Sequence, residues 1–235
     1  MSATVAAPRR PEVMVQGQFV IPRWVEDLES FRRWRLSEDA PDSGAIAFLD
    51  TYIWVDLTLE EFLTHNQVKA AFDYAIMSVV NPASLGRYVP DRMLLTNAEA
   101  KLNTEADGLF VAWETLRLGR LRLVERESQG IMELEGTPDQ VLEVVSKTSV
   151  RKDTVLLRDL YFKAGTPEYW LVDVREGAVS FAILQWTPEG YVAAPGVDGW
   201  IASKVLGKKF QLQKKSDPLG HPQFVVLVGE IANGK

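Results

Sequence analysis

The chain has 235 residues, of which 46% are hydrophobic and 25% are charged, and a formal net charge of −6 at pH 7. This length fits one α/β domain with peripheral additions. Because cysteine is absent, disulfides, thiol nucleophiles and cysteine-ligated metals are excluded, and two histidines, His65 and His221, are too few for a histidine-rich metal centre. No apolar run is long enough for a membrane span or a secretory signal. We therefore expect a cytoplasmic protein, without membrane contact, whose chemistry rests on carboxylates, lysines and arginines.

The negative charge is concentrated in one part of the chain. Residues 26–61 contain ten acids and three arginines, so the remainder is close to neutral. An acidic balance argues against a protein that coats nucleic acid without specificity. It does not exclude a local basic patch elsewhere.

The first 60 residues predict an arm followed by a hairpin. Residues 1–22 are polar and interrupted by proline, which predicts a flexible N-terminal arm, and we expect residues 23–235 to form a single domain. Ala45–Leu49 and Tyr52–Leu57 are short, apolar and β-prone, so they predict a hairpin that turns at residues 50–51.

A long helix is predicted next. Thr58 and Glu61 have capping-box spacing, and Asn81-Pro82 predicts the end of the helix near Val80. His65 is expected on or beside the buried stripe of this helix. The stripe itself is predicted to comprise Phe62, Phe72, Ile76 and Val79.

The middle of the chain reads as short strands. Residues 93–95 are apolar, and Asp107–Trp113 predicts a strand that begins with an acid. Leu121–Glu125 and Ile131–Glu135 alternate apolar and polar residues about a loop that contains Gly130, which predicts a hairpin that projects from the sheet.

A parallel crossover is predicted over residues 140–174. Gln140–Ser146 is almost continuously apolar, as in the covered centre of a sheet. An amphipathic helix is predicted over Val150–Ala164, and Gly165 and Pro167 predict its end. A second central strand is predicted to follow at Tyr169–Val174. Further strands are predicted at Val179–Trp186, Tyr191–Ala194 and Phe224–Val228.

Glu143 is the most unusual residue of these strands, because it interrupts an apolar run. An ionised carboxylate buried there costs several kcal/mol unless a cation meets it. An ion pair with an arginine from a neighbouring element is one explanation. The other is a metal site with Asp107, because two acids on adjacent strands offer the oxygen ligands that Mg²⁺ or Mn²⁺ prefers.

Residues 137–174 contain a run of motif residues in a characteristic order and spacing: Pro138, Asp139, Glu143-Val144-Val145-Ser146, Asp153, Tyr161, Ala164-Gly165, Pro167-Glu168-Tyr169-Trp170 and Asp173. This run resembles the Uma-type restriction endonuclease family, which is part of the PD-(D/E)XK nuclease superfamily. The resemblance extends over nearly the whole chain beyond the arm, including the hairpin and the helix that bears His65. Glu105-Ala106-Asp107 lies where relatives usually have Pro-Asp.

The resemblance implies a restriction-endonuclease-like α/β (α+β) fold, with a mixed sheet flanked by helices and extra β-hairpins. It also implies an endonuclease that hydrolyses DNA phosphodiester bonds with Mg²⁺ or Mn²⁺. Asp107 and Glu143 would be the metal-binding acids, and the carbonyl of Val144 would complete the coordination. His65 corresponds to a histidine that is frequent early on the first long helix of the family.

The lysine of the superfamily motif is missing from its usual positions. Val145 stands two residues after the acid, and Leu157 stands where many relatives have a lysine on the following helix. Lys152 and Arg158 are the nearest substitutes. We favour Lys152, because Arg158 is rotated by about 100° from the expected helix face. The predicted catalytic set is therefore Asp107, Glu143, Lys152 and His65.

Two other functions remain open. Val145, Leu157 and the acidic charge are compatible with a nuclease fold that has lost catalysis and binds nucleic acid or protein. A two-carboxylate enzyme such as a glycosidase is a third hypothesis, which the motif residues do not favour. Nucleases that cut both strands often act as dimers, so a homodimer is one option.

Overall fold

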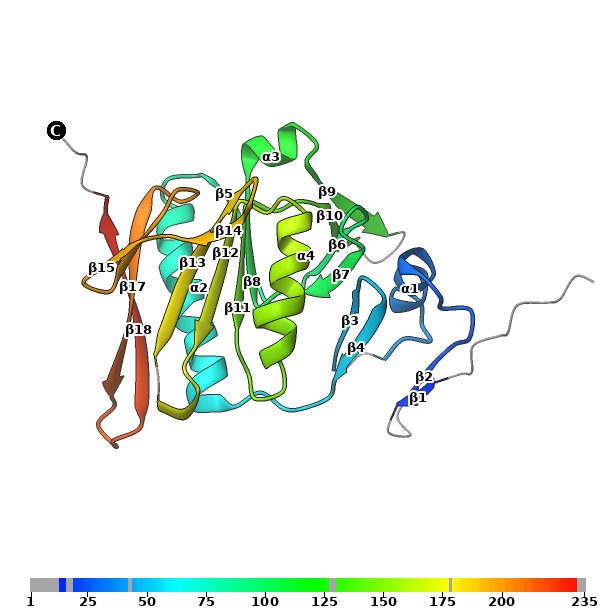
Figure 1. Cartoon of the computed structure of the whole chain (residues 1–235), viewed down its shortest axis with the longest axis horizontal. Coiled ribbons are helices and arrows are strands. Elements are labelled where there is room, and N and C mark those ends of the chain that lie inside the picture. Colours follow the sequence, from blue (N-terminus) through cyan, green and yellow to red (C-terminus); the bar gives the residue numbers. More distant parts are fainter. Residues whose placement is uncertain (1–12, 16–18, 42–43, 127–129, 178, 232–235) are drawn as a thin grey trace, which may run out of the picture. The chain divides into compact units, whose positions relative to one another are not determined.

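The computed structural model describes residues 13–15, 19–41, 44–126, 130–177 and 179–231 (Figure 1). The chain divides into two compact units, residues 1–44 and 45–235. Part of the expected arm, residues 1–12 and 16–18, lies outside the described residues, so the division of the chain at residue 22 stays a prediction. None of the helices in the described ranges is long and apolar enough to cross a membrane.

The first unit contains a small hairpin and one helix. Strands β1 (Val13–Val15) and β2 (Phe19–Ile21) pair antiparallel, and helix α1 spans Leu28–Arg35. Asp27 begins this helix, because its carboxylate accepts a hydrogen bond from the Ser30 N–H.

The second unit is built from three sheets. The central sheet has the order β14-β13-β12-β11-β8-β5, a second six-stranded sheet has the order β4-β3-β7-β6-β10-β9, and a four-stranded sheet has the order β15-β16-β17-β18. The central strands are β5 (Gly86–Pro90), β8 (Gly108–Ala112), β11 (Gln140–Val144), β12 (Glu168–Asp173), β13 (Ser180–Thr187) and β14 (Gly190–Ala193). The second sheet contains β3 (Ala45–Leu49), β4 (Tyr52–Asp56), β6 (Leu94–Asn97), β7 (Leu102–Glu105), β9 (Leu121–Arg126) and β10 (Gly130–Gly136). The third contains β15 (Gly196–Val197), β16 (Trp200–Ser203), β17 (Lys208–Ser216) and β18 (Pro222–Glu230).

The predicted crossover is confirmed. Strands β11 and β12 are parallel, with Glu143 opposite Leu171, and the helical segment between them comprises η2 (Lys152–Leu156) and α4 (Leu157–Lys163). Strand β8 pairs with the other side of β11 in the antiparallel direction. The mixed sheet with flanking helices confirms the predicted fold class.

Two apolar cores lie on opposite faces of the central sheet (Figure 1). One contains Leu142, Trp170 and side chains of helix α2 (Gln67–Val80), together with Phe210 of the four-stranded sheet. The other contains Val141 and Tyr169 with side chains of α4 and of the second sheet. Because strand side chains alternate between faces, Glu143 shares the α4 side with Val141.

The structure corrects the expected start of the long helix. Thr58 does not cap it; the Thr58 hydroxyl donates to Asp56. The Glu61 carboxylate instead accepts the N–H groups of Leu63 and Thr64, so the helix begins with a π-helical turn, η1 (Phe62–Asn66). Phe62 is 65% exposed and was wrongly assigned to the buried stripe, whereas Phe72, Ile76 and Val79 are buried as predicted.

Other element boundaries also differ. Asp107 precedes β8, and Trp113 begins a short helix, α3 (Trp113–Arg117), which the strand pattern did not predict. The hairpin of β9 and β10 is present, but β10 also pairs with β6, so it belongs to the second sheet and does not project alone. Its tip, residues 127–129, lies outside the described residues. A short 3-10 turn, η3, spans Arg175–Gly177.

Candidate active site

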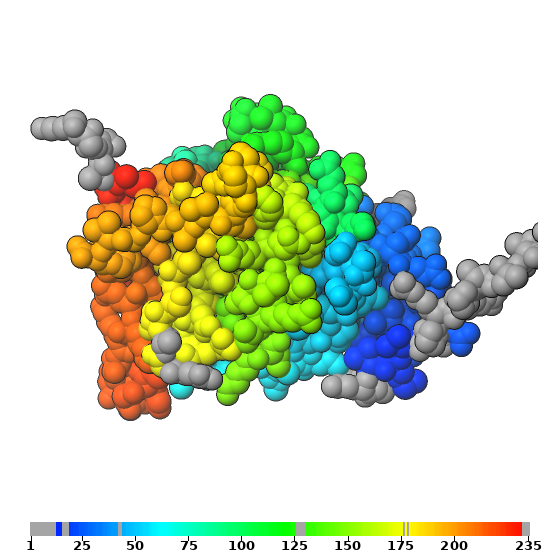
Figure 2. Space-filling view, viewed as in Figure 1, coloured from blue at the N-terminus to red at the C-terminus, as the bar shows by residue number. Residues whose placement is uncertain are grey.

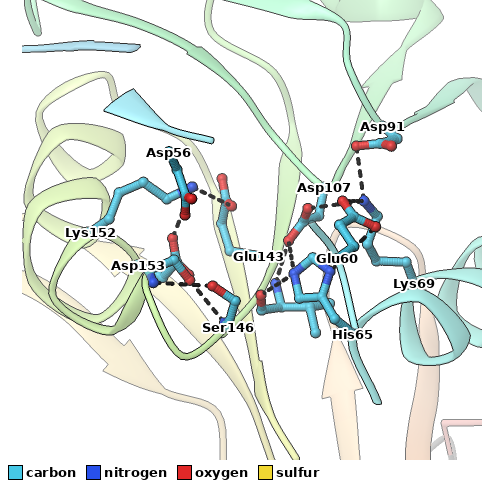
Figure 3. A network of polar contacts seen from close by, with 12 residues as sticks. Asp56, Glu60, His65, Lys69, Asp91, Asp107, Glu143, Ser146, Lys152 and Asp153 are labelled. Carbon is cyan, nitrogen blue, oxygen red and sulfur yellow. Dashed lines mark hydrogen bonds and ion pairs between the residues drawn. The ribbon is translucent and has the colours of Figure 1, made fainter. Parts of the chain in front are cut away.

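Glu143 lies near the carboxyl end of the central strand β11 and is 1% exposed. Its side chain faces α4, and the hydroxyl of Tyr161 on that helix donates a 2.8 Å hydrogen bond to Oε1. Oε2 lies 3.8 Å from Lys152 Nζ, which is an ion-pair distance but longer than a hydrogen bond (Figure 3). The tyrosine therefore fixes one oxygen of Glu143 and leaves the other facing a cation.

Lys152 stands in the π-helical turn η2 at the start of the crossover helix. Its Nζ contacts Glu143 and also lies 3.2 Å from Asp153 Oδ1. Arg158, the other candidate substitute, donates to the Tyr191 carbonyl at 3.4 Å, and Leu157 is buried in the core. Of the two substitutes, the structure brings Lys152 to Glu143.

Asp107 lies beside the carboxyl end of β11, at the start of the neighbouring strand β8. It immediately precedes β8, whose Gly108 is paired with Leu142 of β11. Asp107 Oδ2 accepts a 2.7 Å hydrogen bond from the Val144 N–H, and His65 Nε2 lies 3.7 Å from the same oxygen. The two predicted acids thus belong to paired strands at one end of the sheet.

His65 is anchored to the main chain of β11. Its Nε2 donates a 2.8 Å hydrogen bond to the Val144 carbonyl, which assigns the ring proton to that nitrogen. Nδ1 lies 3.6 Å from Glu60 Oε2. The carbonyl predicted as a metal ligand therefore accepts a hydrogen bond from His65.

Lys69 was missed by the sequence reasoning. Its side chain is almost fully buried, and Nζ lies 2.8 Å from Glu60, 3.0 Å from Asp91 and 3.4 Å from Asp107 Oδ1. Figure 3 shows Asp107 between Lys69 and His65. A signal was available, because Lys69 precedes Phe72 by three residues and Ile76 by seven and so lies on the buried stripe of α2.

Asp153 is a buried acid that contacts Lys152 and the turn before it. It is fully buried, accepts a hydrogen bond from the Ser149 hydroxyl, and contacts Lys152. The Tyr169 hydroxyl donates 2.7 Å to the Asp153 carbonyl. The Ser146 N–H donates to the Ser149 hydroxyl and the Ser149 N–H donates to the Ser146 hydroxyl, so the two residues stabilise the turn that begins the helix.

Burial and like charges both act on the acids of the site. Burial raises the pKa of Glu143 well above its usual value, and Asp107 and Asp153 raise it further, while Lys152 opposes them. Burial also raises the pKa of Asp153 to about 6. Burial disfavours the charge on Lys152, but Glu143, Asp153 and Asp107 outweigh it and raise the lysine pKa.

The donor set fits a divalent cation that prefers oxygen ligands. Five carboxyl groups contact two lysines, so the acidic oxygen donors outnumber the cations. Asp107, Glu143 and the Val144 carbonyl, the predicted ligands, supply oxygen atoms of the kind that such a cation prefers. The oxygens of Glu60, Asp91 and Asp107 also lie within 4.8 Å of one another, but Lys69 Nζ already bridges all three. The five carboxylates are those of Glu60, Asp91, Asp107, Glu143 and Asp153.

Both helices of the site contain a π-helical turn near their start, η1 with His65 and η2 with Lys152 and Asp153. Such turns are rare in proteins, and many of those that occur lie at functional sites. The wider turn changes the direction of the side chains that it carries. The two turns place the histidine and the lysine on either side of the Asp107–Glu143 pair.

The chain matches a known protein family and a solved structure. Residues 28–214 match the model of the family Uma2, described as "Putative restriction endonuclease". The structure is also similar to a crystal structure described as "a putative nuclease belonging to DUF820" from Anabaena variabilis, with a TM-score of 0.55 and 18% sequence identity over 77% of this chain and 90% of that one. No curated protein matches the chain. The resemblance seen in the sequence is confirmed, and the solved structure shares the fold.

Proposed function

Because the chain belongs to the Uma2 family, we propose that it is an endonuclease that hydrolyses DNA phosphodiester bonds with the help of a divalent cation. The observation that carries this proposal is the pair of acids, Asp107 and Glu143, at one end of the paired strands β8 and β11 with Lys152 beside Glu143. A structural ion pair would need one buried acid and one cation. The second acid and the excess of carboxylates favour a site for a cation.

The residues of the chain have separate roles in this proposal. Asp107, Glu143 and the Val144 carbonyl would hold Mg²⁺ or Mn²⁺, which when bound supplies Lewis-acid polarisation of a phosphoryl oxygen and activation of water. Lys152 stabilises the negative charge that develops at the phosphoryl group, because its ammonium stays protonated beside Glu143.

Two further groups are positioning residues. His65 binds the Val144 carbonyl and holds that ligand in place, and Tyr161 fixes one oxygen of Glu143. Hydrogen bonds of this kind orient ligands, and their loss typically lowers metal affinity by about 10- to 100-fold.

The test is cleavage of single-stranded, linear duplex and supercoiled DNA by the purified protein with Mg²⁺ or Mn²⁺, compared with Glu143→Ala and Asp107→Asn. We expect cleavage by the wild type, none by the variants, and loss of metal binding in calorimetry for both. No cleavage of any DNA form, together with unchanged metal binding by Glu143→Ala, would overturn the proposal.

A second candidate is a nuclease fold that binds nucleic acid without cutting it. The positions where relatives carry the motif lysine hold Val145 and Leu157, and both side chains are buried. Lys152 also contacts Asp153, which competes with Glu143 for its charge. DNA binding that survives Glu143→Ala, without cleavage by the wild type, would favour this candidate.

A further inference from the structure

The four-stranded sheet carries a positive charge that contrasts with the rest of the chain. Residues 200–216 contain five lysines and no acid, in a protein of net charge −6. Only strand β18 of this sheet was predicted from the sequence, because β16 is short and β17 has a pair of lysines near each end. The proposed site uses none of these lysines.

Strand alternation divides β17 into two faces. Phe210 is buried and Leu212 packs in the core that contains α2. Lys209, Gln211 and Lys215 therefore point to the opposite side, which we call the outer face. The outer face comprises Trp200 and Ala202 of β16, Lys209, Gln211, Gln213 and Lys215 of β17, and Gln223, Val225, Leu227 and Gly229 of β18.

This face has no acidic side chain, and it remains open. None of the named outer-face residues is buried, and Lys215 and Gln223 are exposed. The nearby acid Glu230 is neutralised by Lys208 at 2.5 Å. In Figure 2 the orange and red segments of the sheet form one side of the second unit.

An aromatic ring lies among these lysines. Lys209 Nζ is 5.0 Å from the centre of the Trp200 ring. Gly229 makes room for both side chains, because a Cβ there would lie 2.9 Å from Lys209 Cε and 3.2 Å from Trp200 Cζ3. The indole of β16 thus reaches across β17 to β18, and the absence of a side chain at Gly229 leaves space for it.

We infer that the outer face binds a single strand of nucleic acid, with Trp200 stacking on a base and Lys209 and Lys215 contacting phosphates. A sheet face with an aromatic ring and cations matches the requirements of single-strand binding, whereas a duplex hides its base faces. From Lys209 to Lys215 the strand extends about 20 Å, which is long enough for several phosphates.

The sheet that carries the outer face also contacts an element of the proposed site. Through its inner face, which holds Phe224 and Val226, strand β18 packs against α2, and it also contacts Phe62–Asn66, the turn that carries His65. In Figure 1 the β17–β18 turn, beside Lys215, lies at the same end as the start of α2. The inference rests on the proposed function in one respect: a nuclease that acts on one strand needs a surface that holds it.

The experiment measures binding without cleavage, in EDTA, with fluorescent oligothymidylate of about 15 nucleotides. Lys209→Gln/Lys215→Gln is expected to reduce the slope of log K against log salt by about 1.4, at about 0.7 per phosphate contact. Trp200→Ala is expected to weaken binding by roughly 5- to 100-fold, and Trp200→Phe to restore most of it. Lys101→Gln/Lys163→Gln, which removes two exposed lysines from other elements, is the matched control.

The proposal is supported if the outer-face variants lose affinity and salt dependence while the control binds like wild type. Equal binding by both double variants overturns it, and so does a preference for blunt duplex that Trp200→Ala leaves unchanged. Because no metal is present, the result is independent of catalysis. A wild type that binds through this face but never cleaves DNA contradicts the proposed function alone.

Discussion

The main-chain N–H of Val144 donates a 2.7 Å hydrogen bond to the carboxylate of Asp107, which ties the residue after Glu143 to the other acid of the site. The carbonyl of the same residue accepts from His65. The main chain of Val144, at the end of β11, therefore contacts two predicted functional side chains, Asp107 and His65, and directly follows the third, Glu143. A shift of this strand end would move them together.

Replacing Glu143 should affect activity and stability in opposite directions. Glu143→Gln keeps the shape but removes a ligand, so we expect cleavage to fall by at least about 100-fold. Because burial raises the pKa of Glu143 in the folded state, its ionisation opposes folding, and the neutral amide should stabilise the metal-free protein. Thermal unfolding in EDTA checks this, and a lower Tm for the variant would contradict the assigned burial cost.

Lys152 can be separated from Arg158 by a matched pair of variants. Lys152→Gln should lower kcat by about 10²- to 10³-fold, because it removes the cation beside the reacting group. Its affinity for Mn²⁺ should not fall, since the lysine competes with the metal for Glu143. Arg158→Gln, on the same helix but directed toward Tyr191, is the control and should cleave at nearly the wild-type rate. Equal losses in both variants would remove Lys152 from its proposed role.

Lys69 should stabilise the fold by neutralising acids. Lys69→Met leaves Glu60, Asp91 and Asp107 without their shared cation, and we expect a loss of about 1–3 kcal/mol, reduced by the partial exposure of Glu60 and Asp91. Denaturant unfolding measures it. Mg²⁺ should stabilise the variant more than the wild type, because the cation replaces part of the lost positive charge.

The contact between Lys69 and Glu60 also predicts how the stability of the protein depends on pH. Burial raises the pKa of Glu60, but the hydrogen bond and charge of Lys69 outweigh this and lower it. A depressed folded-state pKa contributes stability above the unfolded pKa, and this contribution is lost as pH falls through the folded value. Lys69→Met should therefore lose less stability than wild type on acidification below about pH 5. Parallel acid unfolding curves for the two proteins would contradict this.

Gly108 is required by the tyrosine that lies against it. A Cβ at Gly108 would lie 2.1 Å from the Tyr88 hydroxyl, which is held by Asp73 at 2.8 Å. Gly108→Ala should cost about 1–3 kcal/mol and displace the adjacent Asp107, lowering metal affinity. Addition of Tyr88→Phe should recover part of the loss. Gly196→Ala, where the nearest atom is 3.8 Å away, is the control and should be nearly neutral.

Much of the site was predictable because its signals are local. A charged residue within the apolar run of β11 is visible in the sequence, and so is the strand–helix–strand order that makes β11 and β12 parallel. The spacing of acids and the surrounding motif were sufficient to select Asp107 and Glu143 as candidates. Helix starts were less predictable, since Glu61 and Thr58 offer similar caps and only the path of the chain after β4 decides between them.

The sequence by itself determined the chemistry available to this protein: no thiols, few histidines, and a carboxylate placed in a central strand where burial makes it costly. Tertiary structure alone decided which groups surround that carboxylate. Lys69 contacts Asp107 although they are 38 residues apart in the sequence, and Tyr161 contacts Glu143 although they are 18 residues apart. Such contacts form only when the helices pack on the sheet. These contacts depend on packing angles and register, which the pattern of one segment does not contain.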